Sequence, residues 1–262
     1  MAPIDQAVLA DAKTVMLTLL HATEMSGSKA WALETAFAYV LGRDPHTDKR
    51  EAWKELQDIY QKNLTTIYPD QEDPAQSFRR VSGDAFEAFV EGYLNSNEQL
   101  KREGIRAVRL RGEDFDQLMQ RLGIDDLEPK DIDMFLQGVM PDGRVELFGA
   151  VFPKASYAER IRADEYASRR LMEKGLFSVT ITIDARDELG TEEHPSVKRR
   201  KINSGAFHAC YSFHRGTAQG PKVRIVQCHI HGMSNPLVRD VVKTWRHFRD
   251  NKSVPTADAW PA

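Results

Sequence analysis

The stretch "DIDMFLQGVMPDGRVELFGAVFPK", from Asp131 to Lys154, decides the fold of this chain. Two apolar runs flank a Pro-Asp-Gly turn, in which proline fixes one backbone dihedral and glycine supplies a positive φ. The pattern therefore predicts a β-hairpin with its turn at Asp142 and Gly143. Its strands would bring the residues just before the first apolar run opposite the end of the second.

The open end of this hairpin gathers charge. Residues i and i+2 of a strand share a face, so Asp131 and Asp133 would point the same way and Lys154 would approach both across the ladder. A lysine near two carboxylates stays charged, and paired carboxylates attract a divalent metal ion through hard oxygen ligands. A surface ion pair at a strand end is the alternative interpretation of these three residues.

Composition and charge set the broad class. With 262 residues, of which 41% are hydrophobic and 29% charged, the chain is long enough for a globular protein with a sizeable core. No membrane partner is expected, because no apolar stretch reaches the length of a membrane span. The N-terminal residues show no basic region of a signal peptide, and two cysteines make no disulfide framework, so a cytoplasmic location is expected.

Charge is unevenly distributed along the chain. Residues 143–262 contain 20 lysines and arginines against 13 acids, a balance of +7, whereas residues 1–142 contain 16 against 26, a balance of −10. The C-terminal half is therefore the part expected to meet a polyanion. Chance segregation of solvated charge would give the same numbers.

The first hundred residues show helical patterns. Apolar residues at three- and four-residue spacing predict helices in "PIDQAVLADAKTVMLTLLHA", "SKAWALETAFAYVLG" and "DKREAWKELQDIYQKNL", the last with Asp48 as its N-cap. A stretch with two prolines, "YPDQEDPAQ", separates them from a helix expected to open near Ser82. We therefore divide the chain into an N-terminal helical region, residues 1–75, and a second region, residues 76–262.

The second region has a mixed pattern. Beside the hairpin, strands are predicted in "IRAVRL", "FSVTITID", "FHACYSFHR" and "KVRIVQCHI". Helices are predicted in "GEDFDQLMQRLG", "SYAERIRADEYASRRLMEKG" and "PLVRDVVKTWRHF". The sum is a mixed sheet flanked by helices, an α/β or α+β arrangement.

Two helices add charged residues to the hairpin. The helix expected after the hairpin opens with charges of both signs, namely Glu159, Arg160, Arg162, Asp164 and Glu165. Each acid alone is weak evidence, since acids are common at helix starts. In the earlier helix Glu87 stands among apolar residues, either at the rim of the apolar face or held for chemistry. Arg80 lies seven residues before it, about two helical turns, which would put both on one side.

In order and spacing, these residues resemble the PD-(D/E)xK nuclease core: an acid on a helix, an aspartate at the start of one hairpin strand and a lysine at the end of the next. In most of that superfamily the residue two before the lysine is acidic, whereas here it is Phe152. One branch also lacks that acid and takes a carboxylate from the following helix: the Type II restriction endonucleases that recognise DNA sites with a CCGG core. "KASYAERIRADE" is similar to that branch, and the likeness covers roughly residues 78–170.

The resemblance implies a restriction-endonuclease-like α/β core and a role for each acid. Asp133 and Asp164 would bind Mg²⁺, with Glu87 as an outer ligand or second metal site, and Lys154 would orient the attacking water or stabilise negative charge. Asp131 remains the alternative to Asp133. In the same way, Glu165 remains the alternative to Asp164.

The resemblance also implies a DNA interface. Glu159 and Arg160 match the acid–arginine pair that reads C:G pairs, because arginine donates two bonds to guanine and glutamate accepts from cytosine N4. Arg80 fits the upstream arginine of the family, and Arg162 lies beside the pair. The basic stretch "SVKRRK" offers further phosphate contacts in an expected loop, or is a solvated basic turn; its residues are Lys198, Arg199 and Arg200.

The expected activity is therefore Mg²⁺-dependent cleavage of double-stranded DNA at a palindrome containing CCGG. The family usually cuts ahead of the first cytosine and leaves 5′ overhangs. A palindrome is read most simply by a two-fold dimer, so we expect a homodimer or a higher homo-oligomer. The alternatives are a PD-(D/E)xK nuclease with a role in repair or phage defence, and a non-catalytic DNA-binding protein of the same fold.

Overall fold

The computed structural model describes residues 4–22, 28–69, 73–157, 161–226 and 235–256. Its α-helices are α1 (Gln6–Ala22), α2 (Ser28–Arg43), α3 (Lys49–Ile67), α4 (Pro74–Ser96), α5 (Glu98–Arg102), α6 (Gly112–Leu122), α7 (Ile161–Glu173), α8 (Val197–Lys201) and α9 (Pro236–Asn251). Its strands are β1 (Ile105–Val108), β2 (Met134–Val139), β3 (Val145–Lys154), β4 (Phe177–Thr182), β5 (Ala209–Ser212) and β6 (Val223–Ile225). A π-helical turn, η1 (Ile202–Ala206), follows α8. Within these ranges no helix combines the length and the apolar character needed to cross a membrane.

The strands form one mixed sheet in the order β1-β2-β3-β4-β5-β6. The pairs β1–β2 and β2–β3 are antiparallel, whereas β3, β4, β5 and β6 run parallel to one another. The predicted hairpin is β2–β3, in which Met134 pairs with Val151 and Gly143 has the positive φ of the turn, 83°. The register confirms the predicted hairpin and places Asp133 and Lys154 at its open end.

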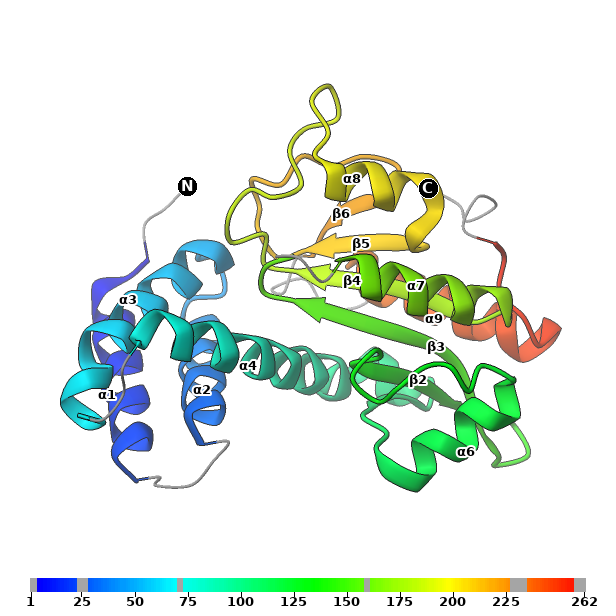
Figure 1. Cartoon of the computed structure of the whole chain (residues 1–262), viewed down its shortest axis with the longest axis horizontal. Coiled ribbons are helices and arrows are strands. Elements are labelled where there is room, and N and C mark those ends of the chain that lie inside the picture. Colours follow the sequence, from blue (N-terminus) through cyan, green and yellow to red (C-terminus); the bar gives the residue numbers. More distant parts are fainter. Residues whose placement is uncertain (1–3, 23–27, 70–72, 158–160, 227–234, 257–262) are drawn as a thin grey trace.

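Helices cover both faces of the sheet (Figure 1). On one face, Ser168 of α7 lies 2.6 Å from Ser178 of β4, measured between their hydroxyl oxygens. On the other, Trp245 of α9 packs against Phe148 of β3, with ring centroids 5.1 Å apart, and covers Gly138. A Cβ at Gly138 would lie 2.5 Å from the Trp245 ring, so this close approach of helix and sheet requires glycine.

Helix α4 joins the N-terminal helices to the sheet. Its first half packs among the α1–α3 bundle, where Phe78 contacts Trp53, and its second half reaches the sheet, where Phe89 contacts Phe213 (Figure 1). A single hydrophobic core runs through both parts. The division of the chain at residue 75 stays a prediction, since α4 packs against both the N-terminal helices and the sheet.

Two local predictions about helices were wrong. Helix α4 begins at Pro74 and not near Ser82, because Asp73 caps it by accepting from the backbone N of Ala75 and Gln76, and proline suits the first helical position. The "SVKRRK" stretch is a helix and not a loop, because the Ser196 hydroxyl caps it by accepting from Arg199 N at 3.1 Å. The predicted N-cap at Asp48 is confirmed.

Candidate active site

Lys154 lies between two carboxylates at the open end of the hairpin. Its Nζ donates to Asp133 Oδ2 at 2.6 Å and lies 3.4 Å from Asp164 Oδ1. The three side chains are 9–12% exposed, so the pairing takes place largely out of solvent. Lys154 ends β3, Asp133 directly precedes β2, and Asp164 lies in the first turn of α7, where the helix dipole favours a carboxylate.

The two acids hold the lysine in its charged form. Burial alone would lower the pKa of Lys154, but the charges of Asp133 and Asp164 outweigh it and raise that pKa above its ordinary value. The ammonium is therefore a permanent positive charge at this end of the sheet. It can stabilise negative charge on a bound anion, and it can donate a hydrogen bond to a water molecule.

Glu87 of α4 faces the same cluster. Burial, and then the charge of Asp133, raises its pKa to about 7, while Lys154 and Arg109 act in the opposite direction. A carboxyl group that loses its proton only near neutral pH reflects first its burial and then the neighbouring charge of Asp133, which Lys154 and Arg109 do not fully offset. Such groups concentrate at functional sites.

The donor set fits Mg²⁺. Two carboxylates approach one cationic nitrogen, so they can also approach one metal ion, and carboxylate oxygens are the ligands that Mg²⁺ prefers. Among the residues that the structure describes, no three His, Cys, Asp or Glu side chains form a group that could hold a metal ion. Mg²⁺ does not need such a cage, because it is usually held by one or two carboxylates together with substrate phosphates.

Arg109 is a site residue that the sequence reasoning missed. Its Nη1 lies 3.4 Å from Glu87 Oε2 and its Nε 2.7 Å from Glu91 Oε2. The signal was present in the strand pattern, since the alternation that buries Ile105 and Ala107 places position 109 on the same face. A charged residue at an inward-facing position is the feature that would have indicated it.

The structure separates the main candidates from their alternatives. Asp131 Oδ2 accepts from Glu128 N at 2.9 Å in a turn before β2, so the expectation that Lys154 approaches both aspartates was wrong. Alternation of side chains does not apply to Asp131, because it lies in the turn and β2 begins only at Met134. Glu165 pairs with Lys201 and Arg169, whereas Asp164 pairs with Lys154.

The predicted DNA contacts have different outcomes. Glu159 and Arg160 lie outside the described residues. Arg80 on α4 and Arg162 on α7 are exposed, as a DNA contact requires. Their roles stay predictions.

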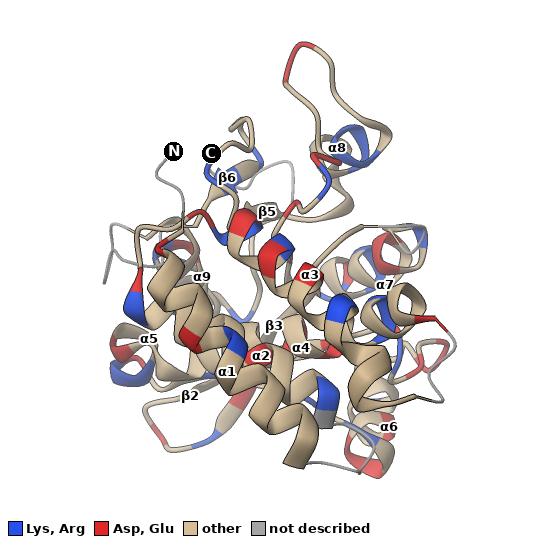
Figure 2. Ribbon diagram, turned by 90° about the vertical axis from the view of Figure 1, so that its left-hand side faces the viewer, with Lys and Arg blue, Asp and Glu red and all other residues tan. Residues whose placement is uncertain are grey.

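The basic helix α8, drawn largely in blue in Figure 2, departs most from expectation. Arg199 has no exposed surface, and its guanidinium donates to the carbonyls of Ala218 at 2.7 Å and Gln219 at 3.1 Å. The prediction that Arg199 contacts DNA was wrong, because a fully buried guanidinium that donates to loop carbonyls cannot reach a phosphate. Lys198 is bonded to Glu188, and the exposed Arg200 donates to Pro195 O at 2.7 Å.

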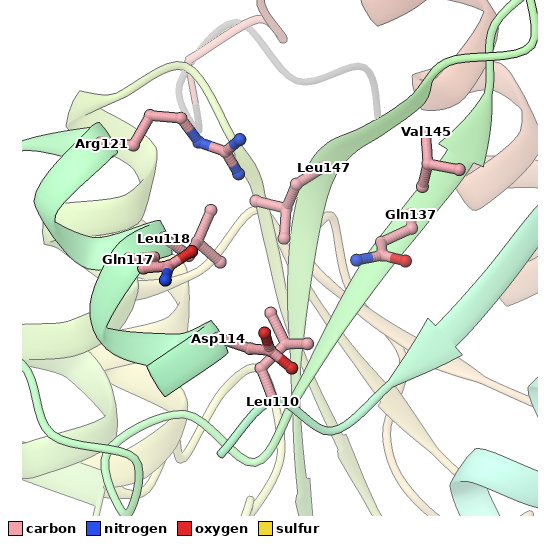
Figure 3. A pocket seen from close by; sticks show the side chains of 8 residues that line it. All are labelled: Leu110, Asp114, Gln117, Leu118, Arg121, Gln137, Val145 and Leu147. Carbon is pink, nitrogen blue, oxygen red and sulfur yellow. The ribbon is translucent and has the colours of Figure 1, made fainter. Parts of the chain in front are cut away.

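A cavity of about 430 Å³ lies between α6 and the β2–β3 hairpin (Figure 3). Leu118 and Leu147 face each other across it, and the polar side chains of Asp114, Gln117 and Arg121 come from the helix. None of the predicted site residues lines this cavity, so it is separate from the cluster around Lys154.

Comparison with known proteins begins with the fold. No protein-family model matches the chain. The crystal structure of a specific complex of the restriction endonuclease AgeI with DNA superposes with a TM-score of 0.77 and 24% identity, covering 92% of this chain and 93% of that one. The chain therefore has a restriction-endonuclease-like α/β fold, as predicted. A pre-specific complex of the restriction endonuclease BsaWI with DNA has a TM-score of 0.47 and 17% identity, covering 94% of this chain and 97% of that one.

Sequence similarity to a known enzyme covers part of the chain. The chain is 35% identical over 184 residues to the Type II restriction enzyme AgeI of Thalassovita gelatinovora. The matched part makes up 62% of this chain and 65% of that enzyme. The chain thus matches slightly less than two thirds of the length of this relative.

Proposed function

We propose that this chain is a Type II restriction endonuclease that hydrolyses double-stranded DNA with Mg²⁺ at a palindrome containing CCGG, leaving 5′ overhangs. The observation that carries the proposal is the buried contact of Lys154 with Asp133 and Asp164 at the open end of the hairpin of a restriction-endonuclease-like fold. The likeness to a Type II restriction enzyme over 184 residues supports the same activity.

Each side chain of the cluster has a task in phosphodiester hydrolysis. Asp133 and Asp164 would hold Mg²⁺, with Glu87 as an outer ligand. When bound, the metal ion acidifies a water molecule and neutralises charge on the scissile phosphate. Lys154, kept charged by the two aspartates, orients the attacking water and stabilises the negative charge that develops on the phosphate.

Sequence recognition belongs to the stretch that leads into α7. Glu159 and Arg160 would read neighbouring C:G pairs in the major groove, and Asp164 follows them at the start of α7. Base reading and metal binding would thus depend on the same short stretch, which couples recognition to assembly of the site. A palindromic target implies a two-fold homodimer, and the N-terminal helices and α9 are its candidate interfaces.

The decisive experiment is digestion of a sequenced plasmid with Mg²⁺, followed by mapping of the ends. We expect wild type to give discrete fragments that end within CCGG. Lys154→Ala should lose cleavage by about 1,000-fold, the upper cost of removing one group that stabilises transition-state charge. The matched control is Lys130→Ala, because Lys130 is exposed and pairs with Glu128 outside the cluster.

Other outcomes point to the alternatives. A smear of fragments would indicate a nuclease without sequence preference. Absence of cleavage under several metal ions, with DNA binding retained, would indicate a DNA-binding protein that keeps the fold without the activity.

A further inference from the structure

The connection between β3 and α7 sets the geometry of the candidate site. Lys154 is the last residue of β3 and Asp164 lies in the first turn of α7. Residues 155–157 are the described part of the connection. Whatever holds these residues therefore helps to determine how close the ammonium and the Asp164 carboxylate remain.

Glu188 holds this connection with one carboxylate. Its Oε2 accepts from Ser156 Oγ at 2.9 Å and from the backbone N of Tyr157 at 2.7 Å, and its Oε1 accepts from Lys198 Nζ. The side chain is 12% exposed, so these hydrogen bonds to a charged group form largely away from water, where they are strong. Burial alone would raise the pKa of Glu188, but the hydrogen bonds outweigh it and that pKa is lowered.

Glu188 is itself well placed to act on the site. It lies in the loop after β4, and β4 runs parallel to β3 with Thr182 opposite Lys154, so the loop leaves the sheet beside the lysine. The backbone N of Glu188 donates to Asp184 Oδ1 at 2.7 Å, which fixes the loop. A carboxylate on a fixed loop transmits that rigidity to the connection it binds.

Helix α8 supplies one cation to the loop that carries Glu188 and another to α7. Lys198 and Lys201 are three residues apart and share one face of the helix. Lys198 pairs with Glu188, and Lys201 pairs with Glu165 in the first turns of α7. Arg199, which is fully buried, fastens the helix to two loops through their carbonyls.

We propose that Glu188 is a positioning residue for the hydrolysis: braced by Lys198 of α8, it holds Ser156 and Tyr157 so that Lys154 and Asp164 stay within reach of one phosphate group. The inference rests on the proposed function. We call Glu188 and Lys198, together with the hydrogen bonds of Glu188 to Ser156 and Tyr157, the brace. Lys198 therefore belongs to the brace and does not make the phosphate contact expected from the sequence.

The test compares cleavage and DNA binding in Glu188 variants. Glu188→Ala should lower kcat by about 10- to 100-fold, as loss of a partner that orients site residues does, with the Kd for CCGG-containing DNA in Ca²⁺ changed less than about threefold. Glu188→Gln keeps an oxygen that can accept from Ser156 and Tyr157, so it should recover part of the loss. Glu193→Gln, in the exposed part of the same loop, is the control.

Lys198→Ala separates the brace from a phosphate contact. As part of the brace, Lys198 should affect cleavage and leave the salt dependence of DNA binding unchanged. As a phosphate contact, it would lower the slope of log K against log salt by about one. The Lys198→Ala and Glu188→Gln losses should also be less than additive, because each removes the same ion pair.

Two results would overturn the inference. One is a Glu188→Ala protein that is folded, as judged by its thermal melt, and cuts DNA as fast as wild type. The other is unchanged hydrogen exchange at the Tyr157 amide in that variant, since this amide donates to Glu188. The exchange measurement needs no cleavage, so it tests the brace even if wild type fails to cut DNA, a result that would count against the proposed function alone.

Discussion

The open end of the hairpin and helix α8 are both rich in charge, and they use it in opposite ways. Around Lys154 the buried carboxylates exceed the cations, and the pKa of Glu87 is raised to about 7 by burial and by Asp133. On α8, Lys198 and Lys201 each have a carboxylate partner, and Arg199 donates to loop carbonyls. An unbalanced buried cluster indicates a site for a cation, whereas a balanced one indicates structural support.

The largest effect is expected at Asp164. This residue pairs with Lys154 of the hairpin, whereas its neighbour Glu165 pairs with Lys201 of α8, so the two positions test the two clusters separately. Asp164→Asn should lower cleavage by about 1,000-fold, since it removes a carboxylate that we propose binds the metal ion and that also pairs with Lys154. Glu165→Gln should cost less than about tenfold, because its pair with Lys201 is partly exposed. Single-turnover rates on a CCGG substrate measure both, and equal losses would contradict the assignment of Asp164 over Glu165.

The next effect concerns stability, and it tests whether the charges of α8 have a structural role. Arg199→Ala should lower the free energy of unfolding by about 3 kcal/mol, because it empties the space of a fully buried side chain and removes the hydrogen bonds that join α8 to the carbonyls of two loops. Arg200→Ala removes an exposed arginine from the same helix and should change it by less than about 0.5 kcal/mol. Urea unfolding measures the difference, and similar values for the two variants would show that α8 is not anchored through Arg199.

The smallest effect is a pH dependence at the unbalanced cluster. The folded pKa of Glu87, about 7, lies above its ordinary value of 4.5, so between these values the folded state binds more protons than the unfolded state. Without divalent metal, its contribution to stability is therefore complete below pH 4.5 and is lost as the pH rises through 7.

Glu87→Gln should remove that loss, and its stability relative to wild type should rise by roughly 2 kcal/mol between pH 5 and pH 8. Unfolding curves at both pH values measure the relative change. Glu91→Gln is the control, because Glu91 is more exposed and also pairs with Arg109. A constant difference between Glu87→Gln and wild type would contradict the raised pKa of Glu87.

Local patterns were sufficient for the sheet and for the ends of the hairpin. Alternation and the turn residues predicted β2 and β3, and hence that Asp133 and Lys154 would meet, because the register of a hairpin follows from its turn. The predicted sheet with flanking helices is confirmed for the same reason: most of its elements carry their own periodicity. The start of α4 and the helical state of α8 were misjudged, since a capping residue outweighed the pattern there.

The sequence by itself determined which residues are available to the site and where the hairpin places two of them. Only the tertiary structure decided what each charge faces. It paired Asp164 with Lys154 and Glu165 with Lys201, brought Arg109 to Glu87, and buried Arg199 under loop carbonyls. The physical reason is that the residue type at one position gives its charge. Whether that charge is neutralised depends on burial and on partners that are distant in the chain.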